Sequence, residues 1–596
     1  MLSCIQNSWV VLRARTFAAC GIASLLATSA IAGEPDADFK ALMEEVWDYS
    51  LSRSPTFATS IGVRDFDDDL GDPSLDAYDE ATKANSDFLG RLEAINRSGL
   101  SADQTLNYDL LRLSLLNRAE DAEHPGKFLY ISNRNGPHTF LARLPTSLPF
   151  FTKADYESYV ARLNDAPAFV AAAISRLQAG VDAGWTQACV PMAGYGKSIR
   201  FHLVDNVSDS VFFRPFEKKP TTISDRDWRN LRAAGEKAIE AAVIPAIRAF
   251  ADFYDGAYAP SCRQDAGVSA LPGGEDYYAH RARFYTTTSM TPDEIHSLGL
   301  SEVKRIRAEM EKIINAVEFE GDFEAFQEYL RTNEKFYAKS PEELLEKNAW
   351  AAKRADGQLT NLFTRLPRMP YTIKEIPADV AESTTTAYYS RPAGDGSRPG
   401  VYWVNTSKLE TRPIYEIEAL TLHEAVPGHH FQIALMQELD LPDFRKYAGQ
   451  TAFIEGWGLY AEQLGLDIGF YQDPYSNFGR LSYEMWRACR LVVDTGIHAM
   501  GWTREQAIGF MAANTALSEH NVTAEVDRYI SNPGQALAYK IGQLKFSELR
   551  GRAQKALGAK FDLRRFHDEA LKDGAVPLSV LEAKMDAWID AERDTR

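Results

Sequence analysis

The sequence predicts a mainly α-helical protein, and three observations lead to this expectation. Apolar residues recur at helical spacing over most of the chain. Helix start signals are clear: Thr291 and Glu294 form a capping box around a proline, and Thr503 with Gln506 forms a second one. Strand signals are few. The 596 residues, 45% of them hydrophobic and 25% charged, suffice for one or two large cores.

The expected helices share the 3.6-residue apolar period and are bounded by turn residues. They cover residues 36–53, 76–97, 155–184, 225–254, 291–317, 341–355, 477–500, 504–514 and 578–592. One strand is expected over 399–405 (PGVYWVN), where β-branched and aromatic residues stand between turn residues. The loop-rich stretch 256–280 suggests an N-terminal helical region, 33–270, and a C-terminal one, 271–596. One continuous domain is the alternative.

The first 32 residues are typical of a cleavable secretory signal peptide. Arg13 and Arg15 precede an apolar run over 17–27, and residues 30–32 form an A-x-A cleavage site. This run is shorter than the roughly 20 residues that a bilayer span needs, and no later stretch approaches one. We therefore expect a periplasmic or secreted protein without a membrane span.

Charge and cysteine content exclude several classes of partner and site. The formal net charge is −18, and loss of the two leader arginines would make it −18 − 2 = −20. Nucleic acid and anionic lipid need basic patches, so neither is expected as a partner. Of the three later cysteines, Cys189 and Cys262 lie in loop-like sequence and are expected to pair, with two free thiols as the alternative. The cysteines are too few and too scattered for a zinc-cysteine site.

The segment Leu420–His430 (LTLHEAVPGHH) carries the chemistry that is easiest to interpret. A zinc hydrolase needs imidazole and carboxylate ligands and a second carboxylate that accepts a proton from water. In the usual H-E-x-x-H motif two histidines share one helix face, but here Pro427 takes the place of the second. Proline should widen or break the helix. A bulged turn would bring His429 or His430 beside His423, and the local sequence leaves both open.

The third ligand should be an acid on a following helix. Glu455 lies in the apolar stretch 449–462 (GQTAFIEGWGLYAE), where an unpaired carboxylate would be costly to bury and metal coordination would remove that cost. Glu462, two turns further on the same face, is a candidate for orienting a ligand. A surface helix end is the alternative for the histidine segment. Three of the eleven histidines fall there beside Glu424, which favours a metal.

Five segments of the chain resemble one bacterial family. They are LPGGEDYY, DGSRPGVYWVN, HEAVPGHH, EGWGLYAE and PGQALAYKIG, and they are similar to the proteins grouped as domain of unknown function number 885. That family is placed with the HExxH-type zinc peptidases, and more distantly it resembles helical zinc oligopeptidases and carboxypeptidases. The resemblance implies a two-lobed helical metallopeptidase-like fold around a deep channel, with a small β-sheet next to the HE helix. It also favours His429 over His430, because of the spacing to Glu455.

The resemblance and the residues together give a set of expected ligands and catalytic groups. Zn²⁺ would be held by His423, by His429 or His430, and by Glu455. Glu424 would accept a proton from water and pass it to the leaving amine. Tyr539, as the resemblance implies, or His498 would stabilise the developing oxyanion.

Substrate contacts are expected from four further places. Arg487 belongs to a polar stripe on 477–500 that also holds Arg490, Asp494 and His498, and a solvated face is its alternative reading. Arg487, Arg528 or Lys540 would bind a substrate carboxylate. The alternatives are that Lys540 lies on the surface and that Tyr539 belongs to the core. The strand 400–405 would pair with an extended substrate as an edge strand, so that Tyr402 and Arg398, together with Tyr388 and Tyr389, line a cleft.

These expectations describe a zinc-dependent hydrolase that cleaves short peptides, of carboxypeptidase or oligopeptidase type. One alternative is a metal-dependent amidase acting on a non-peptide or cell-wall amide. The other is a non-catalytic protein that binds metal or peptide, although such a protein has no need of the base Glu424. The sequence leaves the substrate, the mode of cleavage and the oligomeric state open.

Overall fold

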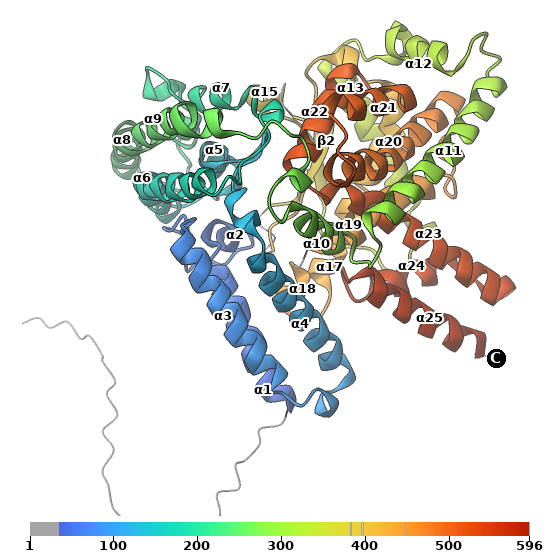
Figure 1. Ribbon diagram of the computed structural model, residues 1–596, viewed down its shortest axis with the longest axis horizontal. Coiled ribbons are helices and arrows are strands. Elements are labelled where there is room, and N and C mark those ends of the chain that lie inside the picture. The colour runs from blue at the N-terminus through green and yellow to red at the C-terminus, as the bar shows by residue number, and fades with distance from the viewer. Residues whose placement is uncertain (1–34, 382–383, 395, 397, 448, 595–596) are drawn as a thin grey trace, which may run out of the picture.

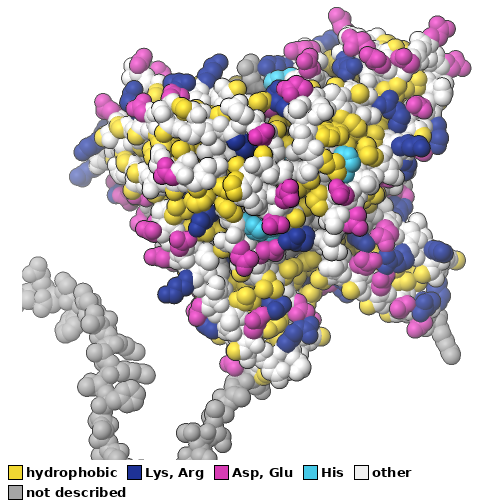
Figure 2. Space-filling view, viewed as in Figure 1, with side chains coloured by type: hydrophobic (Ala, Val, Ile, Leu, Met, Phe, Trp, Pro, Cys, Tyr) yellow, Lys and Arg dark blue, Asp and Glu magenta, His cyan; other side chains and the backbone are white. Residues whose placement is uncertain are grey.

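The computed structural model describes residues 35–381, 384–394, 396, 398–447 and 449–594 (Figure 1). The expected signal peptide lies outside the described residues. Among those described, no helix combines the length and the apolar character needed to cross a bilayer. Acidic and basic side chains are interspersed over the face seen in Figure 2.

The chain begins with helices that stand side by side at the lower left of Figure 1. They are α1 (Pro35–Ser52), α2 (Pro55–Ser60), α3 (Leu75–Glu93) and α4 (Ala102–Glu123). Phe39, Leu92 and Leu115 are almost fully buried between α1, α3 and α4, where they form a small core of their own. This burial is what holds the three helices together.

A second group of helices lies above the first in Figure 1. They are α5 (Pro137–Ser147), α6 (Lys153–Asp182), α7 (Tyr195–Arg200), α8 (Asp225–Ala238) and α9 (Ile244–Phe253). Their core is rich in aromatic residues, among them Tyr159, Phe216 and Phe250. The helix expected over 225–254 is present, but a π-helical turn at Ile239–Val243 separates α8 from α9.

The rest of the chain forms the larger part of the molecule, most of it on the right of Figure 1, although α15 appears near α7. Its helices are α10 (Gly274–Thr286), α11 (Pro292–Ala316), α12 (Phe323–Thr332), α13 (Pro341–Asp356), α14 (Leu359–Leu362), α15 (Ala378–Ala381), α16 (Ile417–Glu424), α17 (His429–Glu438), α18 (Asp443–Lys446), α19 (Thr451–Leu464), α20 (Pro474–Ala499), α21 (Arg504–Asn514), α22 (Glu519–Ser531), α23 (Ala538–Leu557), α24 (Leu563–Leu571) and α25 (Leu578–Asp594). One continuous core joins them and also takes in Leu110 of α4 and Ala188. The two halves of the chain therefore share buried surface.

Two glycines allow the site-bearing helix α19 to lie against α23. A Cβ atom on Gly456 would come within 2.4 Å of the Cα of Gly542, and one on Gly542 would lie 1.9 Å from the carbonyl oxygen of Ala452. Any larger residue at either position would push the helices apart. The helix crossing fixes the depth at which the side chains of α19 sit.

Within the described part of the chain, three strands form one small sheet in the order β1-β3-β2. β1 (Tyr371–Glu375) is parallel to β3 (Gly400–Val404), and β2 (Ala387–Ser390) is antiparallel to it. The predicted strand is therefore confirmed as β3, but the prediction that it is an edge strand is wrong. β3 is hydrogen-bonded to β1 along one edge and to β2 along the other, so it has no free edge with which a substrate could pair. The sheet contacts α16 through β2 and α17 through β3, as expected of a sheet next to the HE helix.

The predicted helices and caps agree closely with the structure. In α11 the Thr291 hydroxyl accepts a hydrogen bond from the Glu294 amide at 3.3 Å, and the Glu294 carboxylate accepts one from the Thr291 amide at 2.8 Å. The same reciprocal bonds join Thr503 and Gln506 at the start of α21. A mainly helical fold with a small sheet is confirmed, whereas the finer prediction of a metallopeptidase-like channel stays a prediction.

Cys189 and Cys262 form a disulfide, as the sequence predicts, and Cys489 is buried and free. The bridge closes a span of 73 residues beside the aromatic core. Because cross-linking a long span restricts the unfolded chain, we expect the double variant Cys189→Ser, Cys262→Ser to lose about 4 kcal/mol of unfolding free energy. Urea unfolding of wild type and variant would measure this, with Cys489→Ser as the control that leaves the bridge intact. Equal unfolding midpoints for wild type and the double variant would contradict the expectation.

Candidate metal centre

The HE helix breaks where the sequence places its proline. α16 ends at Glu424, α17 begins at His429, and Ala425 between them has left the helical region with φ −98° and ψ −108°. Gly428 is required in the turn, because a Cβ atom there would lie 1.9 Å from the His423 carbonyl oxygen. The Pro427 carbonyl accepts a hydrogen bond from the Trp457 indole at 2.8 Å, which ties the turn to α19.

This turn brings His429 back beside His423. Their ring centroids are 4.6 Å apart and their planes stand at 87° to each other. Glu455 of α19 completes the group: its Oε2 lies 3.3 Å from His429 Nε2 and 3.7 Å from His423 Nε2. One ligand atom from each of the three residues lies within 4.8 Å of the others. The residues that the sequence proposes as metal ligands therefore converge.

His430 has a different place. Its Nε2 lies 3.0 Å from the Met369 carbonyl oxygen and its Nδ1 lies 2.9 Å from the Tyr389 hydroxyl. Because a carbonyl only accepts, Nε2 must carry the proton, and Nδ1 then accepts from the hydroxyl. Burial lowers the pKa of His430 to about 4, so the ring stays neutral. Both ring nitrogens are used within the protein, which leaves His429 as the histidine of this pair that faces Glu455.

Glu462 orients His423. Its Oε1 lies 2.8 Å from His423 Nδ1, which leaves Nε2 pointing to the side where Glu455 lies. Gly458 gives the ring its room, since a Cβ atom there would come within 2.8 Å of it. Although burial opposes it, the neighbouring carboxylates of Glu455 and Glu462 raise the pKa of His423 to about 9. Burial also works against ionisation of Glu455, but His429 and His423 hold its pKa well below the usual range.

The three residues open onto a cavity of about 290 Å³. Its lining combines acids, arginines and aromatic side chains from both halves of the chain. The lining residues are Arg134, Thr385, Thr386, Ala387, Tyr388, Tyr389, Leu420, His423, Glu424, His429, Glu455, Tyr483, Trp486, Arg487, Arg490, Glu525, Arg528 and Tyr539. Four of the predicted catalytic or substrate-binding residues, Glu424, Tyr539, Arg487 and Arg528, therefore share one cavity with the three predicted ligands.

Comparison with known proteins places the chain among related sequences. The family model described as a bacterial protein of unknown function (DUF885) matches residues 55–585. The chain belongs to this family. No curated protein matches it.

Two solved structures resemble this DUF885 protein. The crystal structure of a candidate lipoprotein from Colwellia psychrerythraea is 30% identical in sequence, with a TM-score of 0.88, and the match covers 94% of this chain and 100% of that one. A candidate lipoprotein of unknown function from Shewanella oneidensis is 20% identical, with a TM-score of 0.69, covering 92% and 99%. The second likeness shows the fold alone.

Besides His430, four residues that the sequence proposed for the site of this DUF885 protein lie elsewhere. Lys540 is fully buried and pairs with Glu302 at 2.9 Å and Glu484 at 2.8 Å, so its charge is already neutralised inside the protein. Tyr402 is buried, and its hydroxyl donates to Asn348 at 2.7 Å. The structure thus corrects the prediction of substrate binding for both residues.

His498 and Arg398 are the other two corrections. The His498 Nε2 donates to the Tyr529 carbonyl at 2.9 Å, and its Nδ1 accepts from the Val268 amide at 3.2 Å. Burial lowers the pKa of His498 to about 3, so this ring is a neutral packing group with no proton to give a substrate. Arg398 lies in the turn between β2 and β3, where its carbonyl accepts from the Ala393 amide at 3.0 Å, and it does not line the cavity.

The polar stripe on α20 is buried and does not form a solvated face. Arg487 and Arg490 reach the cavity, whereas Asp494 and His498 are used in packing. Sequence reasoning missed Arg134, which comes from the segment before α5 and carried no local signal. It also misplaced the edge of the sheet: Tyr388 and Tyr389 of β2 line the cavity as expected, whereas no residue of β3 does.

Asp494 should give the protein a measurable pH dependence. Its Oδ1 accepts from the Tyr278 hydroxyl at 2.7 Å and from the Gly534 amide at 3.0 Å, yet burial raises its pKa to about 7. An unfolded aspartate titrates near pH ~3.9, so between these values the folded state holds more protons and stability falls as pH rises. Relative to Asp494→Asn, the unfolding free energy of wild type should fall by at most about 1.4 kcal/mol per pH unit there. Urea unfolding over this range would measure it, and a difference independent of pH would contradict it.

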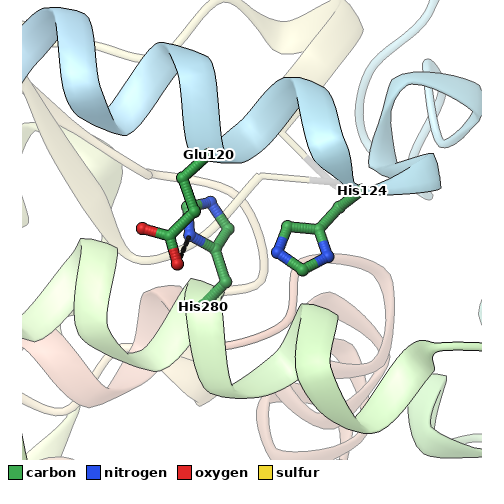
Figure 3. A group of neighbouring side chains, drawn as sticks. All are labelled: Glu120, His124 and His280. Atoms are coloured by element: carbon green, nitrogen blue, oxygen red, sulfur yellow. Dashed lines mark ion pairs between the residues drawn. The ribbon is translucent and has the colours of Figure 1, made fainter.

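A second group of histidine and carboxylate side chains lies where α4 meets α10 (Figure 3). His280 Nδ1 lies 3.3 Å from Glu120, and its Nε2 lies 3.3 Å from Asp121. The His124 ring stacks on His280 with centroids 4.9 Å apart. The same two carboxylates also pair with Arg281 and Arg283, so this group belongs to an ion-pair network that joins the two halves of the chain.

Proposed function

We propose that this protein is a zinc-dependent hydrolase that cleaves peptide bonds in short peptides. The observation that carries the proposal is the convergence of His423, His429 and Glu455 in a cavity that Glu424 also lines. Two neutral imidazoles and one carboxylate are the ligand set of zinc hydrolases. The finer likeness to metallopeptidases that the sequence suggested belongs to this proposal.

The spacing of the donor atoms is compatible with zinc. Tetrahedral ligands at about 2.05 Å from zinc stand roughly 3.3 Å from one another. The Glu455 Oε2 lies at 3.3 Å from His429 Nε2 and at 3.7 Å from His423 Nε2, so small side-chain adjustments would suffice. The His423–Glu462 hydrogen bond is the outer-shell contact that zinc ligands commonly have.

The chain's own groups would share the work of hydrolysis. Zn²⁺ held by the three donors would supply Lewis-acid polarisation of the scissile carbonyl and of a water molecule. The carboxylate of Glu424 would accept the proton that the attacking water loses and would pass it to the leaving amine. Burial and the charge of Glu455 raise the pKa of Tyr539, so its hydroxyl stays protonated and could donate to the developing oxyanion.

We also propose a periplasmic or secreted location. The Cys189–Cys262 disulfide fits an oxidising compartment, and both structural relatives are described as candidate lipoproteins. The residues that would form the signal peptide lie outside those described.

Elemental analysis and a peptide digest test the proposed function. Purified protein should hold about one zinc per chain and should cleave members of a mixed library of short peptides, with products identified by mass spectrometry. A protein that binds no zinc even after loading would sink the proposal and favour a peptide-binding role. Zinc without cleavage of any peptide would instead favour an amidase acting on a non-peptide or cell-wall amide.

A further inference from the structure

Four arginines line the cavity that holds the proposed zinc ligands. Arg487 and Arg490 come from α20, Arg528 from α22 and Arg134 from the segment that precedes α5. We call these four residues the arginine wall. They belong to three separate parts of the chain, and the fold brings their guanidinium groups to one small space of about 290 Å³.

A single carboxylate is shared by three members of the wall. Glu525 lies 3.0 Å from Arg490, 2.8 Å from Arg528 and 3.4 Å from Arg134. Burial opposes its ionisation, but these guanidinium groups hold the pKa of Glu525 well below the usual range, so it carries one negative charge. Within this cluster three guanidinium groups share one carboxylate, an excess of two positive charges, while Glu424 and Glu455 line the same cavity beside the proposed zinc ligands.

The fourth member has a weak partner. The nearest acid to Arg487 is Glu462 at 3.5 Å, and that carboxylate already bonds His423 at 2.8 Å. The Arg487 guanidinium is also held by stacking, 4.6 Å from the ring of Trp486. Because this contact is long and Glu462 also bonds His423, the charge of Arg487 is neutralised incompletely.

Two members of the wall, Arg487 and Arg490, are desolvated, which makes the excess charge significant. Arg487 and Arg490 are only 5% and 4% exposed, and the Nε of the first and one Nη of the second have no hydrogen-bond partner among the described residues. Trp486 and Tyr539 lie 4.5 Å and 4.3 Å from the Arg490 guanidinium and keep its charge apart from water. A buried guanidinium whose anion is shared with other cations or lies far away is costly, and a carboxylate ligand that it binds in bidentate fashion would reduce that cost.

We propose that the arginine wall binds the free C-terminal carboxylate of a peptide substrate, so that the enzyme is a carboxypeptidase that releases residues from the C-terminus. This inference rests on the proposed zinc peptidase function. Every unmodified peptide carries such a carboxylate, and the cavity is small enough that an anion held by the wall lies near the bond at the metal. The aromatic side chains Tyr483, Trp486 and Tyr539 supply an apolar surface for the released side chain.

Measurements of peptide affinity in an inactive variant test the inference separately from catalytic turnover. The zinc-loaded Glu424→Gln variant would be titrated calorimetrically with three N-acetylated peptides: a free acid, the same peptide as C-terminal amide, and an amide with a glutamate in place of its last residue. The free acid should bind roughly tenfold to a hundredfold more tightly than the plain amide. Tightest binding of the glutamate amide would mean that the wall reads an acidic side chain, which would overturn the C-terminal assignment.

Variants of the arginine wall test whether these residues cause the preference for the free-acid peptide. Arg490→Gln and Arg487→Gln, made in the Glu424→Gln background, should each reduce the preference for the free acid at least about fivefold, and Arg490→Lys should retain part of it. Arg97→Gln, which removes an exposed arginine paired with Asp109, is the matched control and should leave the preference unchanged. Zinc content and the thermal midpoint of each variant would show that it still folds. An undiminished preference in folded Arg490→Gln and Arg487→Gln would overturn the role of the wall.

Cleavage by the wild-type enzyme separates failure of this inference from failure of the proposed function. Mass spectrometry should show the free acid losing residues from its C-terminus while the plain amide stays intact. Internal cleavage of both peptides at similar rates would leave the peptidase function standing and overturn the carboxypeptidase assignment. Cleavage of neither peptide by a zinc-loaded enzyme would count against the proposed peptidase function itself.

Discussion

Glu424→Gln should abolish nearly all hydrolysis while leaving the metal in place. The amide has almost the shape of the carboxylate but cannot accept the proton that an attacking water must lose, so kcat should fall by about 10²- to 10⁴-fold. Glu424 lines the cavity but is not one of the three converging donors, so zinc content should stay the same. Elemental analysis and the rate of peptide cleavage, measured on the same preparation, would check both parts.

Retained activity in Glu424→Gln would mean that another group accepts the proton. Loss of zinc from this variant would mean instead that Glu424 is a ligand, and the roles assigned to the carboxylates of the site would have to be exchanged. Glu438, which lies on α17 and bonds the Arg368 amide at 2.7 Å away from the cavity, offers a matched Glu→Gln control. That control should keep both zinc and rate.

His423→Ala should lose most of the bound zinc, and His430→Gln should keep it. Removing one of three converging donors leaves only His429 and Glu455, which is too few for a tight site. His430 bonds Tyr389 and Met369, so its replacement should lower stability while leaving about one zinc per chain. Metal titration with a competing chelator would measure the two affinities.

The orienting carboxylate should show an intermediate effect in the same titration. Glu462→Gln should weaken zinc binding by about 10- to 100-fold, because the ring of His423 would lose a charged partner but keep its place beside Gly458. Zinc loss in His430→Gln with retention in His423→Ala would reverse the choice between the histidines and contradict the site described.

Much of the fold could be predicted from local sequence. The helices that became α1, α3, α6, α11, α13, α20, α21 and α25 follow from apolar periodicity and caps, and both capping boxes are present with their reciprocal bonds. The pairing of Cys189 with Cys262 followed from their loop-like surroundings. Helix periodicity and caps depend on residues a few positions apart, and the disulfide prediction depends on only two cysteines. Both can therefore be made without knowing how the helices pack.

The histidine segment shows where such reasoning stops. Pro427 predicts a break in the helix, and the structure contains it. The direction in which the chain leaves that break depends on the room available to Gly428 and on the hydrogen bond from Trp457, a residue of another helix. Packing therefore decided that His429 faces Glu455 while His430 turns towards β2.

By itself the sequence determined the helical class, the broken HE helix and the types of side chain available for a metal. Only the tertiary structure decided which buried charges have protein partners and which remain for a ligand. Lys540 and Arg490 are both buried cations near the site, but Lys540 has two acids of its own, whereas Arg490 shares one acid with two other arginines. The physical reason is that the cost of burying a charge depends on all groups around it, and helices distant in sequence bring those groups together.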